Sequence, residues 1–215
     1  MDRSKQVAIN TSEMDWLPSP AKGVLRKPLE REAKETGQVT SVVKYQPGSE
    51  FSSHMHPNGE EIFVLNGVFE DEHGSHPAGS YLRNPPGSSH APKSSVGCEL
   101  FVKLNMFQEG DSETVVINTD SKEWLPGINE GLSVMPLHTF GLESMALVKW
   151  KAGTIFTPHV HPGGEEIFVL EGTLEDEHGV YPKGAWIRSP NYSEHHPTSK
   201  EGCIIFVKTG HLPTL

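Results

Sequence analysis

The sequence predicts an all-β protein built from two tandem copies of one domain. Three observations predict this: the chain repeats itself, it is rich in glycine and proline, and its apolar residues fall in short runs. Gly (21) and Pro (17) together form about 18% of the 215 residues. Such a composition favours many short strands joined by tight turns over a helical bundle. We therefore expect a sandwich or barrel in each copy.

The internal repeat covers almost the whole chain. Residues 48–104 return as residues 153–209 without a gap, and 31 of the 57 positions are identical. Upstream, VAINTSEMDWLP (7–18) matches VVINTDSKEWLP (115–126), with a separation that is three residues larger. The three-residue difference is expected in the polar stretch 30–37. Self-similarity on this scale indicates two copies of one fold.

The repeat also predicts the domain boundary. We expect an N-terminal domain over residues 1–108 and a C-terminal domain over residues 109–215, joined at the polar segment 107–113. Each copy is long enough to close a hydrophobic core of its own, unlike the short unit of a solenoid.

Each copy is expected to contain the same elements in the same order. β-Branched runs predict strands at 39–46 and 144–150, and EIFVL predicts short buried strands at 61–65 and 166–170. A hairpin turn is expected at Asn66-Gly67 and at Glu171-Gly172. EDEHG (70–74 and 175–179) is typical of a polar strand end and turn, and ELFVKL (99–104) and IIFVKT (204–209) predict the closing strands. The single helix candidate, residues 28–35, lacks an apolar face.

Charge and cysteine content exclude several classes of function. Asp and Glu (28) outnumber Lys and Arg (18), which gives a net charge of −10 and disfavours binding to nucleic acid. No run approaches 18 apolar residues and the N-terminus lacks an apolar signal region, so we expect no membrane association and a cytoplasmic protein. Only two cysteines are present, which excludes a disulfide scaffold and a four-thiolate zinc site.

Histidines repeat at fixed spacing together with one glutamate. In each copy a His-x-His pair is followed four residues later by Glu, and a third His stands 36 residues after the first. The candidate metal ligands are His54, His56, Glu60 and His90 in the first copy, and His159, His161, Glu165 and His195 in the second.

This pattern points to metal binding. Residues i and i+2 of a strand point to the same side, so both imidazoles of a pair can reach one ion. Three imidazoles and a carboxylate suit Fe(II), Mn(II), Zn(II), Ni(II) or Cu(II), and they leave coordination positions open for a small molecule. The sequence leaves open that one copy has lost its function and keeps its histidines only for packing.

The histidine motifs resemble those of the cupin superfamily. The first copy reads G-x5-H-x-H-x3-E-x6-G from Gly48 to Gly67 and G-x5-P-x-G-x2-H from Gly79 to His90. The second copy departs from this pattern at Tyr192, where the motif has Gly. His196 adjoins His195 there, and the family spacing favours His195 as the ligand.

The resemblance implies a double-stranded β-helix, or jelly roll, in each half, with the metal inside it. Among cupins, the W-L-P element and EEIFVL-x-G are most similar to the cupin-like domain of ChrR-type anti-sigma factors. The resemblance to that family implies a regulatory sensor with bound zinc. Iron, manganese and nickel are the alternative metals. Direct sigma-factor binding is not expected, because the Cys-rich N-terminal anti-sigma module of the family is missing from this sequence.

Two other functions stay open beside the sensor. Related cupins include metal-dependent dioxygenases that act on small diketones, so an enzyme with a small-molecule substrate is the alternative. A binding or storage protein with a structural metal is the third candidate, and it does not require complete ligand sets in both halves. The acidic surface and exposed strand edges are compatible with a homodimer.

Further repeated residues have expected roles. His73 and His178 are expected in solvated turns, with a contact to a metal ligand as the alternative. Cys98 and Cys203 are expected as buried, inert thiols, with a redox-responsive thiol as the alternative.

Charged and aromatic pairs complete the repeat. Glu61 and Glu166 are expected on the opposite face from the ligands. Arg83 and Arg188 are expected to bind either an anionic substrate or the EDE segment. The aromatic pairs, expected to line the barrel, are Phe51 and Phe156, Phe63 and Phe168, and Tyr81 and Trp186.

Overall fold

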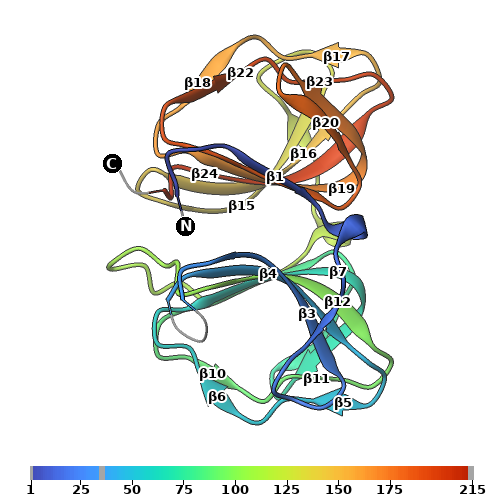
Figure 1. Ribbon diagram of the computed structural model, residues 1–215, viewed down its shortest axis with the longest axis vertical. Coiled ribbons are helices and arrows are strands. Elements are labelled where there is room, and N and C mark those ends of the chain that lie inside the picture. The colour runs from blue at the N-terminus through green and yellow to red at the C-terminus, as the bar shows by residue number, and fades with distance from the viewer. Residues whose placement is uncertain (1, 34–36, 213–215) are drawn as a thin grey trace. The chain divides into compact units, whose positions relative to one another are not determined.

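The computed structural model describes residues 2–33 and 37–212, whose regular secondary structure is almost entirely β-strand (Figure 1). Within these ranges there are two short 3-10 helices, η1 (Thr11–Glu13) and η2 (Thr119–Ser121), and no α-helix. No helix in the described part of the chain is long and apolar enough to cross a membrane. The prediction of an all-β chain is confirmed.

The chain divides into two compact units. The N-terminal unit is Met14–Lys122, and the C-terminal unit combines Asp2–Glu13 with Glu123–Leu215. Each unit has an open ten-stranded sheet with branches and a separate two-stranded sheet.

The N-terminal unit orders its main sheet β13-β9-β7-β12-β4-β3-β2, with β5, β8 and β11 off this path, and pairs β10 with β6. Its strands are β2 (Leu17–Pro18), β3 (Val24–Arg31), β4 (Val39–Tyr45), β5 (Ser49–Glu50), β6 (His54–Met55), β7 (Glu60–Asp71), β8 (Gly74–Pro77), β9 (Ser80–Asn84), β10 (Ser89–His90), β11 (Lys93–Ser94), β12 (Cys98–Leu104) and β13 (Val115–Asn118).

The C-terminal unit repeats this plan. Its main sheet runs β1-β21-β19-β24-β16-β15-β14, with β17, β20 and β23 off the path, and β18 pairs with β22. Its strands are β1 (Val7–Asn10), β14 (Leu125–Pro126), β15 (Leu132–Phe140), β16 (Glu143–Trp150), β17 (Thr154–Ile155), β18 (His159–His161), β19 (Glu165–Asp176), β20 (Gly179–Pro182), β21 (Ala185–Ser189), β22 (Ser193–His195), β23 (Thr198–Ser199) and β24 (Cys203–Thr209).

Each unit completes its main sheet with a strand from the other sequence copy. β1 pairs antiparallel with β21, with Val7 opposite Arg188, and β13 pairs in the same way with β9, with Val115 opposite Arg83. The boundary expected between residues 108 and 109 describes the sequence copies, whereas the compact units exchange their first strands.

A hydrophobic core fills each unit between its strands. In the N-terminal unit, alternate residues of β7 and β12 point inward, among them Ile62, Val64, Leu100 and Val102. The C-terminal core uses the equivalent positions Ile167, Val169 and Ile205. Because these strands are buried on their inner face along most of their length, they fix the frame that carries the histidines.

The expected hairpin turns at Asn66-Gly67 and Glu171-Gly172 are wrong. Both pairs lie inside 12-residue strands, β7 and β19, which pass a β-bulge against β12 and β24. Gly67 has a φ of 74°, and a Cβ at this position would lie 2.0 Å from the carbonyl oxygen of Gly97. The glycine therefore marks a close approach of two backbones within the sheet, not a turn.

The helix candidate 28–35 is also wrong where the structure describes it. Residues up to Arg31 belong to β3, which bulges between Pro28 and Glu30 against β4; residues 34–36 lie outside the described part. The ladder ends at Arg31 opposite Val39, with seven residues between them, whereas the equivalent Thr139 of β15 stands opposite Ser144 of β16, with four residues between them. The three extra residues therefore lie in the β3–β4 connection, as predicted.

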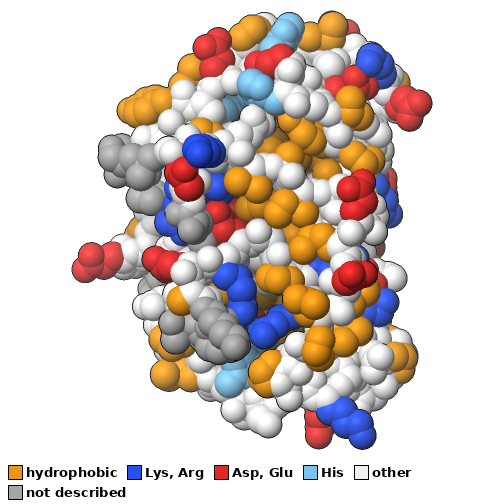
Figure 2. All heavy atoms as spheres, viewed as in Figure 1, with side chains coloured by type: hydrophobic (Ala, Val, Ile, Leu, Met, Phe, Trp, Pro, Cys, Tyr) orange, Lys and Arg blue, Asp and Glu red, His pale blue; other side chains and the backbone are white. Residues whose placement is uncertain are grey.

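Acidic and basic side chains are interspersed on the face that Figure 2 shows, with apolar side chains between them. On that face the net charge of −10 is not gathered into one acidic patch.

Candidate metal centre

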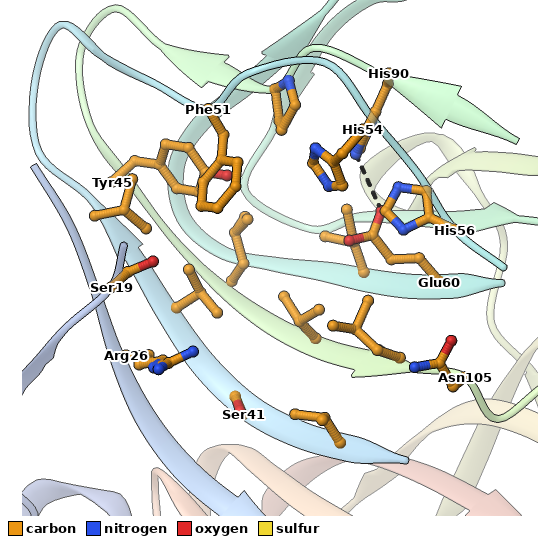
Figure 3. A pocket seen from close by; sticks show the side chains of 18 of the residues that line it. Ser19, Arg26, Ser41, Tyr45, Phe51, His54, His56, Glu60, His90 and Asn105 are labelled. Carbon is orange, nitrogen blue, oxygen red and sulfur yellow. Dashed lines mark ion pairs between the residues drawn. The ribbon is translucent and has the colours of Figure 1, made fainter. Parts of the chain in front are cut away.

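The first histidine cluster lies on the small two-stranded sheet of the N-terminal unit. β6 and β10 pair so that His54 stands opposite His90, and His56 follows directly after β6. The ligand atoms of these three imidazoles all lie within 4.8 Å of one another. Figure 3 shows the three rings turned toward one another above Glu60, which enters from β7.

The carboxylate of Glu60 adjoins two of the three imidazoles. Its Oε2 atom lies 3.4 Å from Nε2 of His56 and 3.3 Å from Nε2 of His90. Asn84 of β9 donates a hydrogen bond from Nδ2 to the same oxygen at 3.0 Å. The carboxylate is therefore fixed by two neighbouring strands, and its side chain is buried.

The C-terminal unit repeats the arrangement with His159, His161 and His195. Oε2 of Glu165 lies 3.5 Å from Nε2 of His161 and 3.4 Å from Nε2 of His195. The Nε2 atoms of His161 and His195 are 3.0 Å apart. The structure thus brings together all eight residues singled out in the sequence, four in each unit.

Tyr192 does not disturb the second cluster. It adopts a left-handed φ of 59°, close to the 83° of Gly87 at the equivalent position. The turn is kept at some backbone strain, and β18 and β22 pair His159 with His195, as His54 pairs with His90. His196 is exposed and lies outside the cluster.

Two aspartates that sequence reasoning did not select hold the last histidine of each cluster. Oδ2 of Asp71 lies 3.4 Å from Nδ1 of His90, and Oδ2 of Asp176 lies 3.4 Å from Nδ1 of His195. The signal was present, because both aspartates occur in the repeated EDEHG segment, 19 residues before the histidine. A carboxylate on one ring nitrogen directs the other nitrogen toward a metal.

Burial shapes the protonation states in both clusters. It lowers the pKa of His56 and of His161 to about 3, and the neighbouring imidazoles add to the effect. Burial also raises the pKa of Glu165 to about 7 against the opposing influence of His195, and it raises the pKa of Glu60. The donors His56 and His161 are therefore neutral at pH 7, as metal binding requires.

His90 and His195 behave differently from the other imidazoles. Burial acts to lower the pKa of each, but the hydrogen bond to Asp71 or Asp176 and the nearby Glu60 or Glu165 outweigh it, so the pKa is raised. In Asp71, burial acts to raise the pKa, yet its contacts with His90 and with the backbone N–H of His73 bring it down to about 2.

The donor atoms fit a divalent ion. Three donor atoms are buried and form no hydrogen bond among the residues that the structure describes, although each lies 3.3–3.5 Å from another donor of its cluster: Nε2 of His56, Nε2 of His90 and Oε2 of Glu165. Leaving such atoms unsatisfied is costly, and one ion would satisfy several at once. Ligands on bonds of about 2.1 Å that meet at 90–110° lie about 3.0–3.4 Å apart, close to the spacings observed.

The N-terminal cluster opens onto a cavity of about 290 Å³. Its wall is largely apolar, with residues such as Val43, Phe51 and Leu100, and it includes Arg26 and Arg31 of β3. Figure 3 places Arg26 in this cavity, apart from the histidines. A small molecule in the cavity would reach the imidazoles and Glu60.

The arginines that repeat in both copies, Arg83 and Arg188, are not among the residues that line this cavity. Arg83 is buried, and its guanidinium pairs with Glu61 at 3.0 Å and with Asp111 at 2.7 Å. Both expected roles of Arg83, substrate binding and a bridge to EDE, are therefore wrong. Arg188 is likewise buried and donates a hydrogen bond to the carbonyl oxygen of Asp2 at 3.1 Å.

Glu61 and Glu166 lie on the opposite face from the ligands, as expected, but both are buried. Oε2 of Glu166 lies 3.1 Å from Nε2 of His211. Buried ion pairs on this face, such as that of Glu61 with Arg83, explain why an alternating strand pattern does not imply solvent exposure here.

The remaining repeated residues divide clearly. His73 and His178 are exposed turn residues whose backbone N–H groups donate to Asp71 and Asp176. The thiols of Cys98 and Cys203 are buried, and burial raises the pKa of each to about 11. The expectation of buried thiols is confirmed.

The aromatic pairs were only partly placed correctly. Phe51 lines the N-terminal cavity and Phe156 packs on the C-terminal core. Phe63 and Tyr81 are opposite each other on β7 and β9, one position out of step with Ile62 and Leu82 of the core. They therefore lie on the opposite face of the sheet from this core, where both are also buried, since side chains alternate along a strand.

The family model described as "ChrR Cupin-like domain" matches residues 4–108 of this chain and, a second time, residues 112–213. The chain belongs to the ChrR cupin-like domain family. The fold prediction of two tandem cupin domains is thereby confirmed, and the two histidine clusters of this ChrR cupin-like chain are groups that could hold metal.

Solved structures agree with the cupin fold. A Nostoc punctiforme protein named "putative dioxygenase" is 16% identical, with a TM-score of 0.81 over 99% of this chain and 85% of that one. A Pseudomonas aeruginosa protein named "putative glyoxylate induced protein" is 14% identical, with a TM-score of 0.78 over 100% and 94%. Oxalate decarboxylase of Lactobacillus farciminis is 13% identical, with a TM-score of 0.68 over 96% and 86%. No curated protein matches the chain in sequence.

Proposed function

We propose that each half of the chain binds one divalent metal ion through three histidines and one glutamate, and that the protein is a metal-dependent oxidoreductase of the dioxygenase type. The observation that carries this proposal is the cavity of about 290 Å³ beside His54, His56 and His90. A metal that only stabilises the fold needs no cavity at its open side, whereas a catalytic metal does.

The metal, when bound, would supply open coordination positions and redox or Lewis-acid chemistry to a small substrate. The residues of the chain would hold that ion and shape the cavity that takes the substrate. Iron, manganese and nickel are the metals compatible with oxidation chemistry; zinc would not support it.

The structural similarity to the protein named "putative dioxygenase" agrees with this proposal. At 16% identity the similarity reports the fold, and the argument therefore rests on the cavity and the donor set.

A second candidate is a ligand- or oxidant-responsive sensor, and the family match over both copies favours it. In that case zinc is the expected metal and the cavity binds a signal molecule without turnover.

Metal analysis followed by oxygen uptake tests the proposal. The purified protein is analysed for metals as isolated, then emptied, reloaded with Fe(II), Mn(II), Ni(II) or Zn(II), and mixed with acetylacetone as a small diketone. We expect oxygen consumption with a redox-active metal, and its loss in the double variant His54→Ala/His159→Ala. Tight zinc binding without oxygen consumption under any metal would favour the sensor, and failure to bind any of the four metals would refute both.

A further inference from the structure

The N-terminal cavity carries two positive charges from one strand. Arg26 and Arg31 both belong to β3 and both line the cavity. In the ladder with β4, Arg26 stands opposite Val43 and Arg31 opposite Val39, which also line it. Opposed residues share one face of a sheet, so the register itself directs both arginines inward.

The same positions in the C-terminal unit are uncharged. Val134 of β15 stands opposite Val148 of β16, as Arg26 stands opposite Val43. Thr139 stands opposite Ser144, as Arg31 stands opposite Val39. Since all four metal-site residues are kept in both copies, the difference between the halves lies in the wall of the cavity.

The charge of the N-terminal cavity favours an anion. Among its lining residues the charged groups are Arg26, Arg31 and Glu60, and a divalent ion at the histidine cluster would more than offset Glu60. A guanidinium presents a planar pair of N–H donors that matches a carboxylate, and such a pair strengthens where water is partly excluded. The remaining wall is mostly apolar, which suits an organic body better than a hydrated inorganic ion.

We propose that the N-terminal unit binds a small organic carboxylate, whose anionic group is held by Arg26 and Arg31, while the C-terminal unit does not select for such an anion. This inference rests on the proposed function, in which a small molecule occupies the cavity beside the metal. The two halves are then alike in metal ligands and different in ligand choice.

Two probes of nearly equal shape test the proposal: acetoacetate, which carries a carboxylate, and acetylacetone, which is neutral at pH 7. Each half is isolated by emptying the other, with His161→Ala leaving the N-terminal metal and His56→Ala leaving the C-terminal one. Affinities are measured by calorimetry on the zinc-loaded proteins. The C-terminal half, which lacks both arginines, shows how strongly the metal ion alone favours acetoacetate over acetylacetone.

We expect the preference for acetoacetate to be at least about tenfold larger in the N-terminal half than in the C-terminal half. The double variant Arg26→Val/Arg31→Thr places the residues of the C-terminal half at these positions, and it should remove that excess. Its affinity for acetylacetone should stay unchanged, which also shows that the cavity is intact. Lys44→Ala, which removes a positive charge from the outer side of β4 beside Glu99, is the matched control and should change neither affinity.

An equal preference in both halves, or an excess that survives the double variant, would overturn the proposal. Inorganic phosphate that competes as well as acetoacetate would overturn the assignment to an organic carboxylate. Metal-free protein separates this inference from the proposed function: if no metal binds at all, the proposed function fails, whereas acetoacetate binding that depends on Arg26 and Arg31 can still be measured.

Discussion

Oδ2 of Asp71 lies 3.4 Å from Nδ1 of His90, and Asp176 and His195 repeat this contact at the same distance in the other unit. Each aspartate comes from the end of a 12-residue strand, and each histidine comes from the short two-stranded sheet. The contact therefore ties the two-stranded sheet of the metal cluster to the main sheet, and it fixes which ring nitrogen faces the other donors.

Replacing Asp71 by Asn should weaken metal binding without removing a ligand. We expect the metal affinity of the N-terminal site to fall by about 10–100-fold, the range seen when such supporting groups are lost. A competition titration with a chromogenic chelator measures it in the His161→Ala protein. Glu70→Gln is the control, because Glu70, on the same strand, accepts from the backbone N–H of Ser95. Equal affinities in both variants would show that the Asp71 contact does not support the site.

Removing one imidazole from either cluster should empty that site. His54→Ala and His159→Ala are each expected to lower bound metal by about one equivalent per chain, since one of four ligands is lost. Elemental analysis after dialysis gives the stoichiometry. His73→Ala and His178→Ala, which alter exposed turn histidines, should leave two equivalents bound. An unchanged stoichiometry in a cluster variant would remove that cluster from the metal sites.

Metal binding at the C-terminal site should weaken as the pH falls through 7. Burial raises the pKa of Glu165 to about 7, so below this pH the ion must displace a proton; His161, whose pKa burial lowers to about 3, stays neutral. For the Glu165 proton alone, the affinity should fall about fivefold from pH 7 to pH 6 and about tenfold over the next unit. His195, whose pKa is also raised, adds to this loss. Chelator competition in the His56→Ala protein measures this.

The control for this pH dependence is Glu165→Gln. It should bind metal more weakly at every pH but with a flatter slope, because the displaced proton is gone. A slope equal to that of the parent would assign the proton to another group.

A fragment cut along the compact unit should be more stable than one cut along the sequence copy. Residues 14–122 keep β13 and Asp111, whereas residues 1–108 lose both and leave the guanidinium of buried Arg83 without the carboxylate that lies 2.7 Å away. Breaking a buried ion pair costs about 3–5 kcal/mol, so we expect the fragment 1–108 to unfold at a much lower denaturant concentration. Equal midpoints in urea would show that the exchanged strand adds nothing to the N-terminal unit.

The two thiols should resist modification in the native protein. Burial raises the pKa of Cys98 and of Cys203 to about 11, so the reactive thiolate is scarce at pH 8. Ellman's reagent should release less than about 0.1 equivalent within minutes from native protein, with or without a chelator, and two equivalents after denaturation. Rapid reaction of one thiol only after metal removal would instead support a redox-responsive cysteine.

Several features of this protein follow from the sequence by itself. The duplication, the all-β class and the proximity of His54 to His56 follow from local spacing, because i and i+2 residues of a strand share a side and the repeat doubles every signal. The extra residues of the β3–β4 connection could be located for the same reason. That Glu60 and His90 join them was implied by the resemblance to the cupin motifs, since His90 lies 36 residues after His54.

Only the tertiary structure decided the rest, because it depends on which strands pair. Strand exchange between the copies, the pairing of Arg83 with Glu61 and Asp111, and the contact of Asp71 with His90 join residues 19 or more positions apart, and no local pattern fixes them. Gly67 shows the limit most clearly: Asn-Gly favours a turn locally, but burial along β7 and the close approach of Gly97 keep the strand continuous. The inward position of Arg26 could not be predicted either, because a charged side chain is expected at the surface. Its pairing with Val43 shows that it lines the cavity.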